Sequence, residues 1–230
     1  YGFDIKTNLP MLLQELVKIP GDFKIRVGMM NPQHVLRIRK ELIEMYRHEK
    51  VFKFLHLPLQ AGSDVVLRKM ARGYTVEQFM DVFQEFKREI PELNIMTDII
   101  VGFPTETEDD YWQTLNVVRQ MNPDSINISR FWARPKTPAA ALEQLPVETI
   151  KHRSKVLMDV FQNISRMQNE RWLGWTGSII IDEKGQLAGQ WIGRNYAYKQ
   201  VIVEGDYKMG DVIRVKISLA NVWDLRGIVI

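Results

Sequence analysis

Hydrophobic residues recur at helical spacing in four stretches of the first 130 residues, and a short apolar run follows each of them. The predicted helices span residues 9–19, 35–46, 79–90 and 111–121, and the predicted strands span residues 23–29, 51–57, 95–101 and 125–131. The strand runs are almost continuously apolar, which is typical of strands covered on both faces in a parallel sheet. This order of elements predicts an α/β fold, either part of a β/α barrel or an open doubly wound sheet.

The pattern changes in the last third of the chain. One long amphipathic helix is predicted at residues 147–168, and after it come short stretches of alternating hydrophobic and polar residues with Gly and Asp turns between them. These predicted strands span residues 178–182, 187–192, 199–203, 212–217 and 226–230. Their length and spacing predict a small closed or nearly closed β-barrel, and so two domains, residues 1–168 and residues 169–230.

Composition narrows the functional classes. Of the 230 residues 45% are hydrophobic, enough for a real core, and a net charge of +3 predicts a mixed surface that permits RNA binding without demanding it. The chain has no cysteine, so it offers neither disulfides nor thiolates for a metal. No apolar run approaches the roughly 20 residues of a membrane span. Because the sequence opens at Tyr1, we expect the native start to lie upstream.

Polar residues gather where the second predicted strand ends and a helix begins, an edge at which α/β barrels bind ligands. Gln60 and Ser63 have side chains that hydrogen-bond a ribose or an amino-acid head group, and the helix opening near Ser63 presents free N–H groups to a carboxylate. The alternative is that Ser63 caps its helix and Gln60 satisfies a loop.

Two further segments lie at the next strand ends. Asp98 interrupts an apolar run, and a carboxylate there needs either a polar cavity or a buried salt bridge. Gly102 has no side chain, so its backbone can approach a flat ring closely. Arg134 lies between a strand and two prolines and is suited to bind phosphate or carboxylate, although the residue taken singly favours an exposed arginine on a loop.

The barrel sequence combines cations and aromatic rings in one short stretch. Arg194, Tyr196, Tyr198 and Lys199 have the side chains that hold phosphates and stack on unpaired bases, which predicts an RNA-binding surface. Packing inside the barrel is the alternative for the aromatic rings.

Taken in order, the segments 56–64, 98–107 and 127–140 closely resemble the methylthiotransferase branch of the radical S-adenosylmethionine enzymes. Residues 1–10 and 26–32 resemble the archaeal and eukaryotic subgroup that acts on N6-threonylcarbamoyladenosine in tRNA, and the tail resembles a TRAM domain. The resemblance implies a partial (β/α) barrel of the radical SAM type followed by an OB-like TRAM barrel.

The resemblance also implies cofactors and roles. Family members use S-adenosylmethionine and two [4Fe–4S] clusters, whose cysteine ligands are absent here, so we expect no catalytic or metal-binding residue in this chain and no activity from it alone. Cofactor binding is implied for six residues: Gln60 and Ser63 toward the ribose and methionine end, Asp98 toward polar groups, the backbone of Gly102 and Phe103 against the adenine, and Arg134. Thr105 and Lys136 replace the usual glycines, which puts the shape of these loops in doubt.

The implied partner is the anticodon stem-loop of tRNA, modified at adenosine 37 in the cytoplasm, without contact to a membrane. Two other functions stay open: a non-catalytic tRNA-binding module, and a methylthiotransferase acting on a ribosomal protein. Because the leading strands of the barrel are missing, an open sheet edge predicts a dimer or an exchange of segments between chains.

Overall fold

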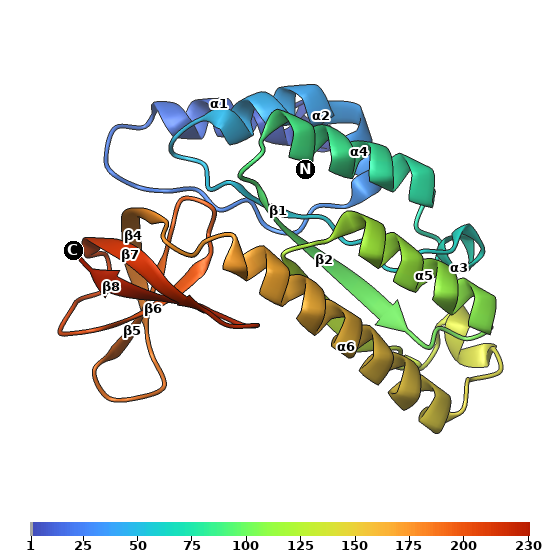
Figure 1. Cartoon of the computed structure of the whole chain (residues 1–230). Coiled ribbons are helices and arrows are strands. Elements are labelled where there is room, and N and C mark those ends of the chain that lie inside the picture. The colour runs from blue at the N-terminus through green and yellow to red at the C-terminus, as the bar shows by residue number, and fades with distance from the viewer. Residues whose placement is uncertain (1) are drawn as a thin grey trace.

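The computed structural model describes residues 2–230, which form an α/β domain followed by a β-barrel (Figure 1). The α/β part contains the 3-10 helix η1 (Phe3–Ile5), α1 (Leu9–Lys18), α2 (Pro32–Arg47), β1 (Phe54–His56), α3 (Asp64–Lys69), α4 (Val76–Glu89), β2 (Asn94–Val101), α5 (Glu108–Met121), β3 (Ser125–Arg130), η2 (Pro138–Ala141) and α6 (Val147–Glu170). The predicted helices are confirmed, and helix and strand alternate from β1 onward, with α3 and α4 between β1 and β2.

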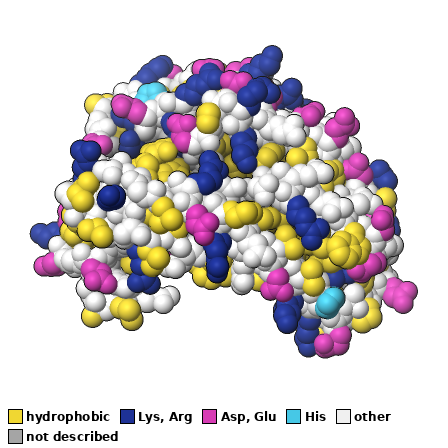
Figure 2. Space-filling model, in the orientation of Figure 1, with side chains coloured by type: hydrophobic (Ala, Val, Ile, Leu, Met, Phe, Trp, Pro, Cys, Tyr) yellow, Lys and Arg dark blue, Asp and Glu magenta, His cyan; other side chains and the backbone are white. Residues whose placement is uncertain are grey.

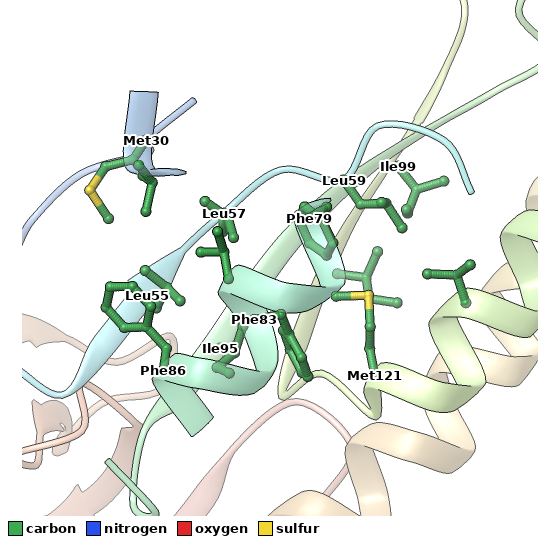
Figure 3. Packing of buried hydrophobic residues seen from close by; sticks show 14 of the residues in the cluster. Met30, Leu55, Leu57, Leu59, Phe79, Phe83, Phe86, Ile95, Ile99 and Met121 are labelled. Atoms are coloured by element: carbon green, nitrogen blue, oxygen red, sulfur yellow. The ribbon is translucent and has the colours of Figure 1, made fainter. Parts of the chain in front are cut away.

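A parallel sheet in the order β1-β2-β3 organises the first domain. Because side chains alternate across a strand, Ile95, Ile99 and Val101 of β2 join a continuous hydrophobic core, whereas Asp98 and Ile100 line a cavity on the opposite face. Figure 3 shows the core between β1, β2 and α4, where Phe83 and Phe86 are labelled beside the strand residues. The helical face of the sheet is thus filled by side chains, and the carboxyl half of the opposite face lines the cavity.

The strand predicted at residues 23–29 does not form as a regular strand. Ile25 makes an isolated parallel bridge with Val51, and the next sheet bond comes only from the Met30 N–H to the His56 carbonyl, at 3.0 Å. Between them the Arg26 guanidinium lies 4.9 Å from the ring centres of both Phe54 and Tyr198. The segment between Ile25 and Met30 therefore runs along the edge of the sheet without the regular hydrogen-bond ladder of a strand. The predicted strand at residues 51–57 is likewise shortened to β1.

The second domain is a closed barrel with the strand order β4-β5-β6-β8-β7. Its strands are β4 (Thr176–Lys184), β5 (Gln190–Arg194), β6 (Gln200–Glu204), β7 (Val212–Ala220) and β8 (Leu225–Val229). They enclose a separate core, and β6 pairs with β8 in parallel to close the barrel. The predicted barrel is confirmed, whereas the boundary at residues 168 and 169 stays a prediction; α6 itself continues to Glu170.

The barrel rests on the amino end of the sheet and on the end of α6. The Lys53 N–H donates to the Tyr196 carbonyl at 2.8 Å, and Asn94 Nδ2 donates to the Ala197 carbonyl at 2.9 Å. From α6, Ser165 Oγ donates to the Val222 carbonyl at 2.6 Å. The two domains are therefore joined by direct hydrogen bonds as well as by chain continuity.

Surface charge is mixed, as the net charge predicts. Basic and acidic side chains are interspersed over the face shown in Figure 2, with hydrophobic groups between them. No helix in the described part of the chain combines the length and apolarity needed to cross a membrane.

Candidate active site

A cavity of about 720 Å³ opens at the carboxyl ends of β1, β2 and β3. Its walls include Asp98 and Ile100 from β2 and Asn127 and Ser129 from β3. These residues alternate along their strands, so they share the face of the sheet opposite the helices. The carboxyl edge of a parallel sheet is where α/β folds commonly bind ligands, because the loops that follow the strands meet there.

Asp98 lines this cavity as a buried carboxylate. Its Oδ2 atom lies 3.0 Å from Nε2 of His56 on the neighbouring strand. Its Oδ1 atom finds no hydrogen-bond partner among the described residues, although the whole side chain is only 12% exposed. Buried carboxylate oxygens usually accept a hydrogen bond, so this atom is an acceptor still available at the cavity. The environment of Asp98 combines the two alternatives, because its side chain both lines a cavity and has a partner, the imidazole of His56.

Gln60 lies on the cavity wall in the left-handed region, with φ of 70°. Its N–H donates to the Asp98 carbonyl at 2.8 Å, and its carbonyl accepts from the Ile100 N–H at 2.9 Å, so Gln60 extends the sheet by one residue. Its side-chain Oε1 accepts from Nη2 of Arg72 at 2.8 Å. The side-chain amide is therefore held in place and still borders the cavity.

Tyr74 closes the same wall beside Gln60. Its hydroxyl donates to the carbonyls of Pro58 and Leu59, each at 3.1 Å. Burial raises the pKa of Tyr74 to about 12, so the hydroxyl stays protonated and keeps donating at physiological pH.

Ser63 lies behind the cavity wall in the protein interior. It is 1% exposed and caps α3, and its Oγ donates to Oδ1 of Asp110 at 2.5 Å. Burial alone raises the pKa of Asp110, but hydrogen bonds from Ser63 and Thr107 outweigh it and hold the pKa below its ordinary value. These contacts favour the helix-cap alternative for Ser63 over direct contact with a ligand.

Gly102 follows β2 with φ of 81°, a conformation that favours glycine. A Cβ atom there would lie 2.5 Å from Cγ1 of Ile150, so α6 covers the open side of the glycine. Phe103 is buried and packs edge-on against Phe131, with ring centres 5.1 Å apart. Phe131, which follows β3, lines the cavity, whereas Phe103 packs behind it.

An ion pair anchors the Gly102 loop to α6. Oε2 of Glu106 accepts from the Gly102 N–H at 3.0 Å and from Nη1 of Arg153 at 2.8 Å. Nη2 of Arg153 also reaches Glu108 at 2.9 Å. The loop that ends β2 is thus fixed by side chains of α5 and α6.

Arg134 lies at the rim of the cavity with an exposed side chain. It forms no ion pair with any residue that the structure describes. Its guanidinium is therefore accessible to an anionic group, and the binding of one stays a prediction.

The four residues predicted to bind RNA lie together at the junction between the domains. Lys199 is 7% exposed, and its Nζ contacts Oδ1 of Asn169 at 2.8 Å and Oδ1 of Asp124 at 3.2 Å. The ring centres of Tyr198 and Phe54 are 5.3 Å apart, so Tyr198 packs against β1. For these two residues, the contacts favour a role in joining the domains.

The side chains of Arg194 and Tyr196 are more exposed to solvent than that of Lys199. Arg194 pairs with Asp182 at 2.9 Å, and its guanidinium lies 4.8 Å from the ring centre of Tyr198. Tyr196 is 37% exposed and rests against Trp172 and Trp175.

Several cavity residues were missed as site residues, among them Arg72 and Trp132. His56, which contacts Asp98 from the neighbouring strand, was missed as well. A usable signal existed for His56, because it is the first residue of the segment 56–64 on which the resemblance rests. Arg72 is distant in sequence from Gln60, and no local pattern indicates their contact. The described residues contain no group of three His, Asp or Glu side chains arranged to hold a metal.

Comparison with known proteins identifies both domains. The model of the radical SAM superfamily matches residues 3–118, and the model of the TRAM domain matches residues 173–230. A solved structure of coproporphyrinogen III oxidase (HemN) from Escherichia coli, a radical SAM enzyme, superposes with a TM-score of 0.54 over 90% of this chain and 50% of that chain. At 16% identity this likeness shows the fold alone.

Curated relatives are similar along nearly the whole chain. The probable threonylcarbamoyladenosine tRNA methylthiotransferases of Pyrococcus abyssi and Methanocaldococcus jannaschii are 43% and 42% identical over 92% and 99% of this chain, and over 51% and 52% of their own length. The threonylcarbamoyladenosine tRNA methylthiotransferase of Homo sapiens is 38% identical over 99% of this chain and 39% of its own. The chain spans about half the length, or less, of these relatives.

The predicted fold class, a radical SAM-type α/β domain followed by a TRAM barrel, is confirmed, and so is the resemblance on which it rested. The chain belongs to the radical SAM superfamily.

Proposed function

We propose that this chain is the S-adenosylmethionine- and tRNA-facing part of an enzyme that adds a methylthio group at C2 of N6-threonylcarbamoyladenosine 37 in tRNA. One observation carries the proposal. Identity of about 40% to the curated methylthiotransferases extends along both the cavity-bearing domain and the barrel. A shared fold alone would not give this level of sequence identity over both domains.

The cavity suits S-adenosylmethionine by its chemistry. The free Oδ1 atom of Asp98 is an acceptor for hydroxyl or ammonium donors, and the guanidinium of Arg134 is a donor for a carboxylate. Phe131 provides an aromatic surface for a flat ring. These groups match the polar and planar parts of the cofactor.

Iron–sulfur clusters are held by cysteine thiolates, and this chain has none. We propose that the ligands of the two [4Fe–4S] clusters belong to another part of the protein, and that this chain is inactive alone. When bound, the cofactors supply the radical and sulfur chemistry. The residues of this chain position the cofactor and the RNA.

Individual roles follow from the contacts. Asp98, Gln60 and Arg134 border the cavity and contact the cofactor or the substrate in this proposal. Ser63, Gly102 and Phe103 keep their implied cofactor roles as predictions. Their contacts in the structure support shaping of the cavity wall from behind.

For RNA, we propose that the TRAM barrel contacts the anticodon stem-loop of a cytoplasmic tRNA. Tyr196 and Arg194 are the members of the predicted set with more accessible side chains. A non-catalytic tRNA-binding module is the second candidate, favoured by the absence of cysteine from the sequence.

The decisive experiment uses the full-length protein. Its clusters are reconstituted without oxygen, tRNA carrying N6-threonylcarbamoyladenosine is added with S-adenosylmethionine and a sulfur source, and digested nucleosides are analysed by mass spectrometry. The expected product carries one methylthio group. Tight tRNA binding without this product supports the binding module instead. Asp98→Asn is expected to weaken cofactor binding by about 10- to 100-fold, since a hydrogen bond to a charged group contributes about 1.5–3 kcal/mol.

A further inference from the structure

Trp132 has the highest exposed fraction, 83%, among the large hydrophobic side chains that the structure describes. It lies two residues after the end of β3, and the last bond of the sheet, from the Phe131 N–H to the Val101 carbonyl at 2.8 Å, fixes the backbone just before it. The indole lines the cavity at the carboxyl edge of the sheet. It makes no ring contact or hydrogen bond with another described residue. An indole is thus held at the mouth of the cavity with its surface open.

The charges around Trp132 are positive. Arg130 and Arg134 line the same cavity two residues to either side of it, and neither is ion-paired within residues 2–230. Arg72 contributes a third cation, and Asp98 is the carboxylate of the lining. A net positive wall is complementary to an anionic partner and not to a neutral apolar one.

The loop after Trp132 holds this arrangement. Both the N–H and the Oγ1 of Thr137 donate to the Arg134 carbonyl, at 3.3 Å and 2.7 Å. Pro135 and Pro138 restrict the backbone of this loop, because the proline ring fixes the φ angle. A preformed loop reduces the entropy lost when a ligand binds.

Other exposed tryptophans lack this combination. Trp112 is 48% exposed on α5 and does not line the cavity. Trp223 is 60% exposed but packs against Phe161, with ring centres 5.9 Å apart. An open indole between two unpaired guanidiniums is the combination that binds single-stranded nucleic acid, in which bases stack on aromatic rings and phosphates bind arginine.

We propose that Trp132 is a stacking platform for an unpaired nucleobase of RNA, and that Arg130 and Arg134 bind the phosphates beside that base, which assigns Arg134 to the substrate and not to the carboxylate of the cofactor. The proposal rests on the proposed function for its choice of RNA. It does not depend on any chemical step. It places an RNA contact at the cavity itself, separate from the barrel.

The test measures the affinity of this chain for a fluorescein-labelled RNA hairpin with unpaired adenosines in its loop, by fluorescence anisotropy. Stacking contributes about 1–3 kcal/mol per base, so Trp132→Ala is expected to raise the Kd by about 5- to 150-fold, and Trp132→Phe by less. Trp112→Ala is the matched control and should leave the Kd unchanged. Circular dichroism melting confirms that each variant is folded.

A double-mutant cycle tests stacking itself. Each loop adenosine is replaced in turn by an abasic nucleotide, and at one position the loss should be much smaller in Trp132→Ala than in the parent chain. Replacing Arg130 and Arg134 by Gln should lower the slope of log Kd against log salt by roughly one unit per lost phosphate contact.

Several results overturn the proposal: no RNA binding by this chain, an unchanged Kd in Trp132→Ala, or no coupling at any abasic position. If coupling is found but the full-length protein adds no methylthio group, the proposed function fails and the platform stands. If methylthiolation proceeds and coupling is absent, the platform alone is wrong.

Discussion

The carboxylate of Glu106 and the guanidinium of Arg153 form an ion pair that the fold buries almost completely, with side-chain exposures of 2% and 6% and 2.8 Å between Oε2 and Nη1. It joins the loop after β2 to α6. The same carboxylate oxygen accepts the Gly102 N–H, so one pair fixes both the loop backbone and the helix that covers it.

Arg153→Met is expected to lower the free energy of unfolding by about 3–5 kcal/mol, because it leaves a buried carboxylate without its partner. Burial raises the pKa of Glu106, and removal of the opposing charge raises it further. Urea unfolding followed by circular dichroism measures the loss. The control is Lys151→Met, which breaks the exposed pair with Glu148 and should cost less than about 1 kcal/mol. Equal small losses in both variants would contradict the prediction.

Gly102→Ala should be more destabilising than Gly174→Ala. Both glycines have φ near 80°, so both substitutions incur about 1–2 kcal/mol of backbone strain. Only Gly102 has an atom of Ile150 2.5 Å from the added Cβ, whereas nothing lies within 4 Å of the corresponding Cβ at Gly174. The difference between the unfolding temperatures of the two variants measures the effect of the steric clash with Ile150, because the backbone strain is common to both. It should shrink when Ile150→Ala is added, and an unchanged difference would refute the assignment.

Ser63→Ala should lower stability in a pH-dependent way. The pKa of Asp110 is below its ordinary value in the folded protein, so its ionised form contributes stability that is present above the unfolded pKa of about 3.9. That contribution is lost as the pH falls through the folded pKa. We expect the substitution to lower the free energy of unfolding by about 1–3 kcal/mol at neutral pH, and by less below about pH 4. Urea unfolding across this range tests it, with the exposed Ser178→Ala as control. A loss that does not change with pH would disprove the coupling.

Lys199→Met tests whether Lys199 joins the two domains or binds RNA. The substitution leaves Asp124 without its cation, and we expect a loss of about 3–5 kcal/mol together with separate unfolding of the barrel and the α/β domain in calorimetry. Lys208→Met, an exposed lysine of the same barrel, should change neither. Unchanged stability with weaker RNA binding would instead support the predicted RNA contact.

Hydrophobic periodicity predicted most of the elements, but it did not distinguish a partial β/α barrel from an open doubly wound sheet. The helices α1, α2, α4, α5 and α6 and the barrel follow from spacing, because each buries one continuous apolar face. The segment at residues 23–29 shows where the pattern is insufficient. Its apolar residues indicate a strand, but Arg26 lies against rings that come from β1 and from the barrel, a contact that no local pattern contains.

The site was predictable in position more than in detail. Asp98 was identifiable because a carboxylate in an apolar run needs a specific environment, and the cavity and His56 provide it. Ser63 and Lys199 have the chemistry of ligand-binding residues, yet their partners Asp110 and Asp124 lie more than 40 residues away. Such partners are fixed by tertiary packing, so sequence alone cannot distinguish a ligand contact from an internal one.

Helix α6 connects the two ends of the molecule as one uninterrupted element. Its 24 residues extend about 36 Å, from the Gly102 loop beside the cavity to the barrel (Figure 1). A straight helix has a fixed length, so α6 sets the distance between the two surfaces proposed to contact RNA. A nucleic acid that touches both must be long enough and folded enough to span that distance, which makes the size of the substrate a criterion of selection in addition to its sequence.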